Sequence, residues 1–344
     1  QANKYDMAKM EEEITRIYSE IQLEEKIEQM KENAAVTNNF FYFTGWVPEG
    51  SIQKIRDFLE SKYKDIITVS ENPEEIGSEV IPPTKLKNNW VISPFELLVN
   101  MYGVPNYNEV DPTLFLGVTY LILFGAMFGD VGQGLVLVLA GFLLRRKSKK
   151  GTDGRDYGEI LFRIGMSSTF FGFMYGSIFG DEEVLPALIV RPLENINFVL
   201  YSAIAFGVIL LLISFGISIY NLKSEGDIKE CLFGRNGLTG LVFYVSLLSF
   251  GLQMLLSAVL IPNAVLAVIM IASLAALLFK TPLYSIIFKE EAHYEEGKGT
   301  YYIEGGFDLI ETILSLLSNS ISFIRIGAFA LNHVGLFLAF STMA

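Results

Sequence analysis

Residues 305–344 read GGFDLIETILSLLSNSISFIRIGAFALNHVGLFLAFSTMA, and this stretch decides the fold class. After Glu311 it stays apolar for more than the roughly 20 residues that a helix needs to span a bilayer. Its one formal charge there is Arg325. On a helix that rises about 1.5 Å per residue, Arg325 lies about 20 Å beyond Glu311, with a similar or greater length of apolar helix after it. The sequence therefore predicts a positive charge near the middle of the membrane.

Polar residues accompany Arg325 along one face of this predicted helix, interrupted by Phe329. Their spacing of 4, 3, 4, 3 and 7 lines one side of an α-helix. An arginine at the bilayer centre costs from about 3 to more than 10 kcal/mol, so such residues usually face a bundle interior or a water-filled path. Two interpretations stay open, a structural arginine paired with another helix and a fixed charge in an ion pathway. The members of this polar stripe are Glu311, Ser315, Ser318, Ser322, Arg325 and Asn332.

The 344-residue chain is 51% hydrophobic and 19% charged, and these two properties occupy different parts of it. Residues 1–110 hold 11 Lys/Arg and 19 Asp/Glu, which accounts for −8 of the net charge of −12. We therefore expect a polar domain over residues 1–110 and a transmembrane helical domain over residues 111–344. One cysteine and two histidines exclude an intramolecular disulfide framework and argue against a zinc site. No metal or cofactor is expected.

The polar part predicts a coiled-coil end followed by a small α+β lobe. Isoleucines and Met30 at helical spacing favour one strand of an antiparallel coiled coil over a simple amphipathic helix. The aromatic, β-prone residues 38–47, a helix from Ser51 to about Tyr63 and a strand over 66–69 make the lobe. Six prolines in residues 71–112 indicate an extended connector to the membrane.

Apolar segments predict a polytopic α-helical membrane protein with about seven spans. Residues 114–144 are too long for one comfortable span. The sequence GDVGQG at residues 129–134 indicates a tight turn between two helices, with one long broken helix as the alternative. The other spans are expected at about 160–179, 198–222, 238–261, 264–279 and 305–344.

Basic residues give these spans an orientation. If the N-terminal lobe is cytoplasmic, the inner connections carry 12 Lys/Arg, including Arg235 and Lys280, whereas the outer ones carry only Arg191. Such an imbalance places the basic loops and the lobe in the cytoplasm. The RRKSKK segment at 145–150 is one of these short loops, which argues against a nucleic-acid patch.

The segments FGAMFGD at 124–130 and FGFMYGSIFGD at 171–181 form an internal echo. Their glycines recur every four residues, which favours close packing of helix backbones. The acidic residues that end these segments are expected to be solvated loop ends or to line an outer vestibule. They are Asp130, Asp181, Glu182 and Glu183.

Four segments resemble signatures of one family, in that family's order. They are FTGWVP at 43–48, PPTKLKNNWVISPFELLVNMYGVPNYNEVDPT at 82–113, FGAMFGDVGQG at 124–134 and SISFIRIGAFALNHVGL at 320–336. The chain is therefore similar to the membrane subunit of rotary ATPases, subunit a of V-type enzymes and subunit I of archaeal and bacterial A/V-type enzymes. The resemblance covers nearly the whole chain.

Departures from that pattern refine the resemblance. Eukaryotic members carry a Trp-containing segment where this chain has residues 326–328, and His where it has Asn319 and Gln133, so a prokaryotic member in a cell membrane is expected. The chain is expected to begin inside a longer helix. It is also expected to stop before the family's final helix.

The resemblance implies a non-catalytic stator subunit. In the family, the arginine at the position of Arg325 stands between two aqueous half-channels, faces the rotor ring and favours release of H+ or Na+ from a rotor carboxylate. The implied partners are the proteolipid rotor ring, peripheral-stalk subunits bound by the N-terminal domain, the central-stalk cap subunit and the lipid bilayer. Other positions associated with the channel lining fall on Glu311, Ser318, Asn319, Ser322 and His333.

Two other functions stay open. A secondary transporter would use an inverted repeat with a midplane site, but both copies of the glycine echo have the same orientation. A membrane scaffold would use Arg325 only for packing. Nucleotide binding is not expected, because the segment Gly297-Lys298-Gly299 lacks the upstream glycine and the hydroxyl of a P-loop.

Overall fold

The computed structural model describes residues 13–14, 16–28, 35–36, 41–63, 66–72, 82–149, 151–181, 184–256, 261–289, 294 and 297–343. The chain divides into two compact units, Gln1–Pro83 and Thr84–Ala344. Residues 84–110, which the sequence assigned to the polar domain, pack within the second unit.

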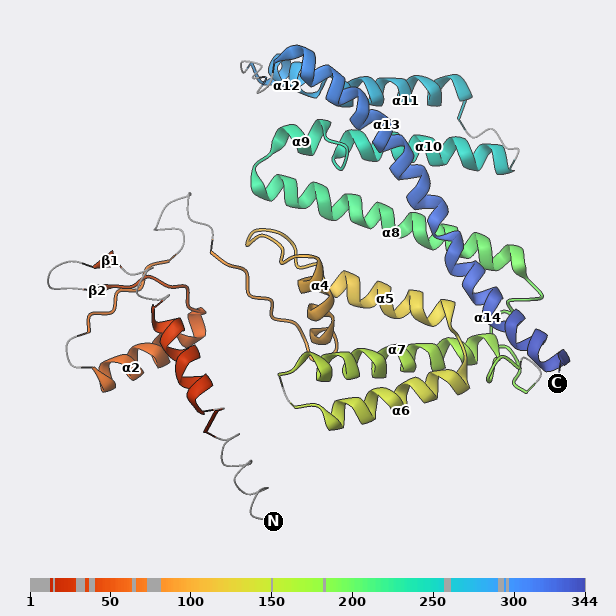
Figure 1. Cartoon of the computed structure of the whole chain (residues 1–344). Helices are drawn as coiled ribbons and strands as arrows, with labels where there is room; N and C mark the ends of the chain where they lie inside the picture. Colours follow the sequence, from red (N-terminus) through yellow and green to blue (C-terminus); the bar gives the residue numbers. More distant parts are fainter. Residues whose placement is uncertain are drawn as a thin grey trace. The chain divides into compact units, whose positions relative to one another are not determined.

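The first unit combines helices with one very short strand pair (Figure 1). Strands β1 (Ala35–Val36) and β2 (Phe41–Tyr42) pair antiparallel, and helix α2 (Ile52–Lys62) follows the 3-10 turn η1 (Glu49–Ser51). The strand predicted at residues 66–69 is wrong, because these residues have no regular secondary structure.

The predicted coiled-coil end falls on residues that are helical where described, between 13 and 28. Its isoleucines, including Ile14 and Ile21, are exposed within this chain. Met30 lies outside the described residues. Pairing with a second strand stays a prediction.

The predicted extended connector contains a short helical element. The 3-10 turn η2 (Ser93–Phe95) begins with Pro94 in its first turn, where a missing N–H is harmless, and leads into α4 (Glu96–Tyr102). Phe95 is fully buried against Ile160 and Ile164. The connector therefore contributes a core residue to the second unit.

Asp111 accepts hydrogen bonds at the start of the first apolar helix. Partial burial raises its pKa, but hydrogen bonds from the side chain and backbone of Thr113 and from Asn88 outweigh burial and hold the pKa below its ordinary value.

The rest of the second unit is mostly helical. Its helices of 15 residues or more overlap the apolar segments that the sequence predicts, and two shorter helices, 228–233 and 280–288, lie in predicted connections. The chain reverses after Phe128, so the predicted tight turn between two helices is confirmed. The helices are α5 (Thr113–Met127), α6 (Val131–Lys147), α7 (Asp153–Tyr175), α8 (Ile196–Glu225), α9 (Ile228–Phe233), α10 (Leu238–Leu256), α11 (Asn263–Leu278), α12 (Lys280–Phe288), α13 (Lys298–Ser322) and α14 (Ile324–Met343).

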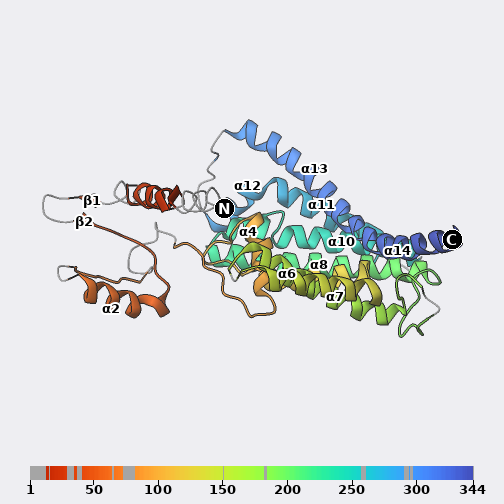
Figure 2. The ribbon, with the colours of Figure 1, turned by 60° about the horizontal axis from the view of Figure 1, so that its bottom comes forward.

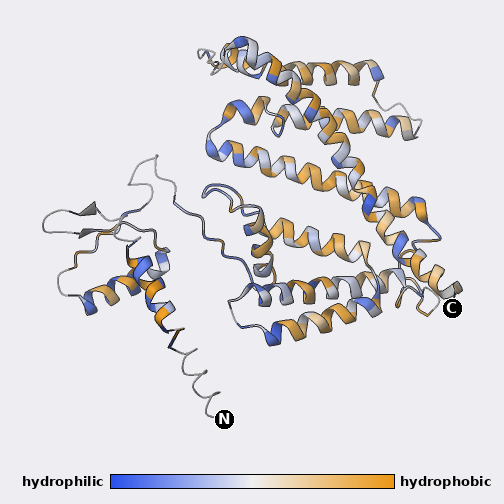
Figure 3. Ribbon diagram, viewed as in Figure 1, coloured by the Kyte–Doolittle hydropathy of each residue, from blue (hydrophilic) through white to orange (hydrophobic). Residues whose placement is uncertain are grey.

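Among the described residues, three helical stretches are long and apolar enough to cross a membrane: Ile196–Glu225 (α8), Ile228–Met254 (α9 with α10) and Lys298–Phe340 (α13 with α14). Helices α11 and α12 together make a fourth candidate, bent by 84°. Helix α5, at 15 residues, falls short of the length of a straight span. Figure 3 shows apolar residues dominating α8, α10 and α11. Three or four of the seven predicted spans are thus supported by length and composition.

The helices form two groups crossed by one tilted rod. Helix α7 lies between α5 and α6, while α8, α10 and α11 run side by side (Figure 1). The rod made by α13 and α14 contacts α11 and α8 first, then α8 and α5. In Figure 2 the same rod runs along one side of the helices. One side of α13 and α14 is therefore packed, and no helix in the described part of the second unit covers the other.

Glycines bring α6 and α7 into backbone contact. A methyl group added at Gly165 would lie 2.6 Å from the backbone nitrogen of Val138, and one at Gly172 would lie 2.3 Å from that of Val131. On α5, Gly125 leaves room for Phe171 and Ser167 of α7. The predicted packing role of the glycine echo is confirmed.

Gly165→Ala should destabilise the helical unit by about 1–3 kcal/mol, because the added methyl group meets backbone atoms that cannot rotate away. Gly216→Ala on α8 is the matched control, since nothing lies within 4 Å of its methyl position. Thermal unfolding of the two variants in detergent measures the difference. Equal melting temperatures for both would contradict the backbone contact.

Candidate functional site

Helices α13 and α14 meet at a one-residue break just before Arg325. The break is Phe323, and the N–H of Ile326 donates to its carbonyl oxygen at 3.0 Å, as in a tightened helical turn. The ring of Phe323 packs onto Gly207 of α8, where an added methyl group would lie 2.2 Å from its Cγ. The predicted continuous helix over 305–344 is therefore interrupted where its charge lies.

The packed side of this rod is apolar or hydroxylated. Thr312 and Leu316 of α13 and Ala330 and Val334 of α14 are buried. The hydroxyl of Ser320 lies 3.0 Å from that of Tyr244 on α10. These contacts fix which face of the rod remains open.

The polar stripe lies on the open face. Its members are all exposed, and Asn319 lies beside them with its amide 3.3 Å from the hydroxyl of Ser315. The structure therefore confirms that these side chains share one face, which the described residues of the second unit leave uncovered. The exposed polar residues of this face are Glu311, Ser315, Ser318, Asn319, Ser322, Arg325 and Asn332.

Arg325 has no counter-charge in the described part of the chain. Its Nη2 donates to the hydroxyl of Ser322 at 3.0 Å. The ion pairs among described residues do not include it. A structural arginine would have a carboxylate or carbonyl partner on another helix, and neither is seen there.

Glu311, at the other end of the stripe, has a partner that the sequence did not indicate. Its Oε1 lies 2.8 Å from Nη1 of Arg235, in the turn between α9 and α10. Both side chains are about half exposed or more, at 63% and 49%. The pair joins the start of the stripe to the α9–α10 turn.

His333 does not join the stripe. It is 14% exposed on the packed side of α14, with Nε2 at 3.8 Å from Oδ2 of Asp130 and its ring nearly perpendicular to that of Phe128. The structure places it at the α5–α6 turn. A role for His333 in lining a channel stays a prediction.

Asp130 is neither a solvated loop end nor part of a vestibule, so that expectation is wrong for this residue. It is fully buried and caps α6 by accepting from the N–H of Gln133 at 2.8 Å. It also accepts from the Ser177 hydroxyl and from the N–H groups of Phe179 and Gly180, at 2.6–2.9 Å. One carboxylate thus ties the start of α6 to the segment after α7. Asp181 is partly buried, and Glu182 and Glu183 lie outside the described residues.

Asp130→Asn should destabilise the unit by about 1–3 kcal/mol. Each carboxylate oxygen accepts from a backbone N–H, so the amide nitrogen of Asn must face one of these donors and leave it unsatisfied. Asp227→Asn is the matched control, because Asp227 is an exposed cap of α9 and Asn caps equally well. The measurement is the melting temperature of each variant. An unchanged melting temperature for Asp130→Asn would show that this hydrogen-bond network is dispensable.

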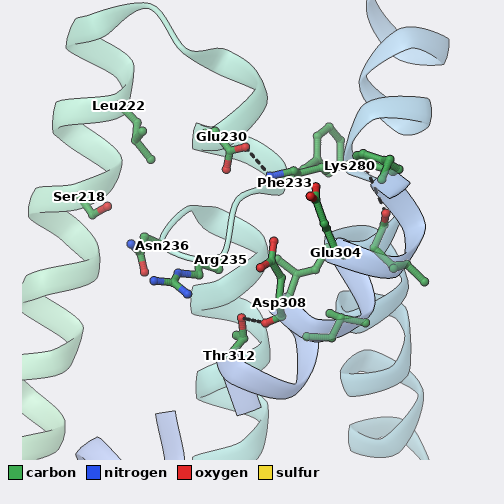
Figure 4. A pocket seen from close by; sticks show the side chains of 15 residues that line it. Ser218, Leu222, Glu230, Phe233, Arg235, Asn236, Lys280, Glu304, Asp308 and Thr312 are labelled. Atoms are coloured by element: carbon green, nitrogen blue, oxygen red, sulfur yellow. Dashed lines mark hydrogen bonds and ion pairs between the residues drawn. The ribbon is translucent and has the colours of Figure 1, made fainter. Parts of the chain in front are cut away.

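A charged cavity of about 420 Å³ lies beside the start of the stripe, lined by residues of α8, α9, the α9–α10 turn, α11, α12 and α13 (Figure 4). Lys280 Nζ lies 2.7 Å from Oε1 of Glu230, and Tyr301 bridges α11 and α12 through the N–H of Thr281 and the carbonyl of Leu278, both at 3.2 Å. In the sequence, Arg235 and Lys280 served only to predict the orientation of the spans. The charged residues of its lining are Glu230, Arg235, Lys280, Glu304 and Asp308. The described residues contain no group of three or more His, Cys, Asp or Glu arranged for a metal ion.

Residues 1–184, more than half of the chain, match the V-type ATPase 116kDa subunit family. The chain belongs to this family. The resemblance drawn from its motifs is thereby confirmed.

Curated relatives agree with the family assignment. "A-type ATP synthase subunit I" of Thermococcus kodakarensis is 31% identical over 62% of this chain and 34% of its own length. The protein of the same name from Methanocaldococcus jannaschii is 25% identical over 98% of this chain and 50% of its own length, so this alignment includes the α13–α14 rod. The "Vacuolar proton translocating ATPase 100 kDa subunit" of Dictyostelium discoideum is 32% identical over 44% of this chain. The chain spans between a third and a half of the length of the first two relatives.

Proposed function

We propose that this chain is part of the stator membrane subunit of a rotary A/V-type ATPase and that Arg325 faces the rotor ring. The observation that carries the proposal is an exposed guanidinium, without a carboxylate partner among the described residues, on the uncovered face of a long apolar rod. Such a charge in a membrane requires a partner from outside the chain or a water-filled path. Membership of the family and the names of its relatives support the same function.

The proposed mechanism is electrostatic. A rotor carboxylate that carries H+ or Na+ turns through lipid as a neutral site and ionises when it meets Arg325. A fixed opposite charge within about 4–6 Å lowers a carboxylate pKa by about 1–3 units, which corresponds to about 1.4–4 kcal/mol. That is enough to release the ion without holding the rotor permanently. Arg325 also blocks leakage, because a cation meets a like charge there in low dielectric.

The rest of the assignment belongs to the same proposal. The stripe from Glu311 to Asn332 lines half-channels on either side of Arg325, the N-terminal coiled coil and α+β lobe bind peripheral-stalk and central-stalk cap subunits in the cytoplasm, and about seven helices cross a prokaryotic cell membrane. The polar side chains of the stripe can contact water on the open face. The basic inner loops support the orientation.

In the complete subunit assembled with its rotor, Arg325→Gln should abolish coupled ion transport and Arg325→Lys should remove most of it. A permanent, multi-donor cation engages a passing carboxylate better than a strongly hydrated ammonium does. We expect a fall of about tenfold or more for Arg325→Gln. ATP-driven ion uptake in vesicles, normalised to assembled complex, is the measurement.

Ser318→Ala is the matched control on the same face, and it should cost only a modest factor because water can replace its hydroxyl. Glu311→Gln should fall between the two, since it removes a charge that concentrates cations. Near-normal uptake by Arg325→Gln would reject the ion-path function and favour a scaffold in which Arg325 only packs.

Cysteine labelling tests the orientation. In a background where Cys231 is replaced by Ala, Asn195→Cys should react with an impermeant reagent in sealed cells and Lys149→Cys should not, because both sites are exposed but lie on opposite sides. Ser177 is unsuitable for this test since it is fully buried. Labelling of Lys149→Cys alone would reverse the topology.

A further inference from the structure

We propose that Arg235 is a positioning residue that holds the carboxylate of Glu311 at the inner end of the stripe and competes there with the transported cation. The inference rests on the proposed function, since it concerns ion entry toward Arg325. Its observation is the ion pair of 2.8 Å between the α9–α10 turn and α13, beside the charged cavity.

The backbone holds Arg235 in a fixed place. The turn closes through Gly234 N–H to the Glu230 carbonyl at 2.9 Å and Gly237 N–H to the Gly234 carbonyl at 3.1 Å. A methyl group at Gly237 would lie 2.3 Å from the Glu230 carbonyl oxygen, and one at Gly240 would lie 1.7 Å from that of Arg235. Only glycines allow this turn, so the backbone position from which the Arg235 side chain extends is fixed.

The cavity links this turn to the neighbouring helices. Lys280, where α11 bends into α12, pairs with Glu230 of α9, so its charge is already engaged across the cavity. Arg235 is the other basic residue of the lining, and it pairs with Glu311 instead. Each of the two cations thus has its own carboxylate.

The charges around Glu311 come from several elements. Helix α8 adds only uncharged residues to the cavity lining, among them Ser218 and Leu222. The region contains four carboxylates and two basic side chains, so its net negative charge attracts cations. These charged groups are Arg235 of the α9–α10 turn, Lys280 of α12, Glu230 of α9, and Glu304, Asp308 and Glu311 of α13.

Competition at Glu311 follows from exposure and geometry. An ion pair whose members are both about half exposed is weak and exchanges readily. When H+ or Na+ reaches Glu311, Arg235 can move to Asp308, which lines the same cavity and lies one helical turn earlier (Figure 4). When the ion leaves, Arg235 returns. Arg235 therefore lowers the affinity of the inner entrance for the ion and keeps the Glu311 carboxylate directed toward the α9–α10 turn.

The test uses the assembled complex in vesicles whose cytoplasmic face is outward, with uptake recorded over a series of external pH values and Na+ concentrations. Arg235→Gln should lower the ion concentration at half-maximal uptake about threefold to tenfold, because a nearby cation disfavours binding of another. Arg235→Lys keeps the charge and should leave that concentration unchanged. In the Glu311→Gln background, adding Arg235→Gln should cause no further change.

The matched control is Arg191→Gln, which breaks an exposed Arg–Glu pair of 3.1 Å with Glu194 at a distant loop and should leave the ion dependence unchanged. If Arg235→Gln does not assemble, Glu311→Asp draws the carboxylate back from Arg235 and should shift the dependence in the same direction. An unshifted dependence in Arg235→Gln or Glu311→Asp overturns the inference. An unshifted dependence would leave the proposed function intact as long as Arg325→Gln still abolishes uptake.

Discussion

A guanidinium on the uncovered face of a membrane helix must find a counter-charge or water, and this constraint organises the second unit. Among the described residues of the second unit, Arg325 has neither a carboxylate partner nor a covering helix. The opposite side of the same rod packs on α8 and α5, with Phe323 fitted onto Gly207. The fold therefore holds the charge in place from behind and leaves it open in front, which is the arrangement that a passing partner requires.

The feature of the candidate site that the sequence predicted best was the one that depends on local helical periodicity. The spacing from Glu311 to Asn332 was enough to predict a shared helical face, because helix geometry fixes it without reference to the rest of the chain. The break at Phe323 could not be predicted in this way, since it accompanies a contact with a glycine in a helix far away in the sequence. The Arg235–Glu311 pair was missed for the same reason, although both charges are plain in the sequence.

Two errors have a common physical origin. Asp130 ends an apolar segment and so resembled a solvated loop residue. The Ser177 hydroxyl and the N–H groups of Phe179 and Gly180 nevertheless donate hydrogen bonds to it, in addition to the N–H of Gln133. Residues 66–69 are β-prone, yet strand propensity mostly reflects packing on neighbouring strands, and none pairs with them among the described residues. In both cases the outcome depends on what the rest of the chain brings near.

The glycine contacts between α6 and α7 have a mechanical consequence. Where backbone meets backbone, no flexible side chain lies between the helices to rearrange under load, so the pair resists shear as one stiff body. Helix α14 is joined to this body in its C-terminal half, where Phe337 packs on Gly180 and His333 faces Asp130. A sideways force on the rod near Arg325 would then be passed into a rigid support, so a partner that pushed past this face, such as the rotor ring of the proposed function, would meet little recoil.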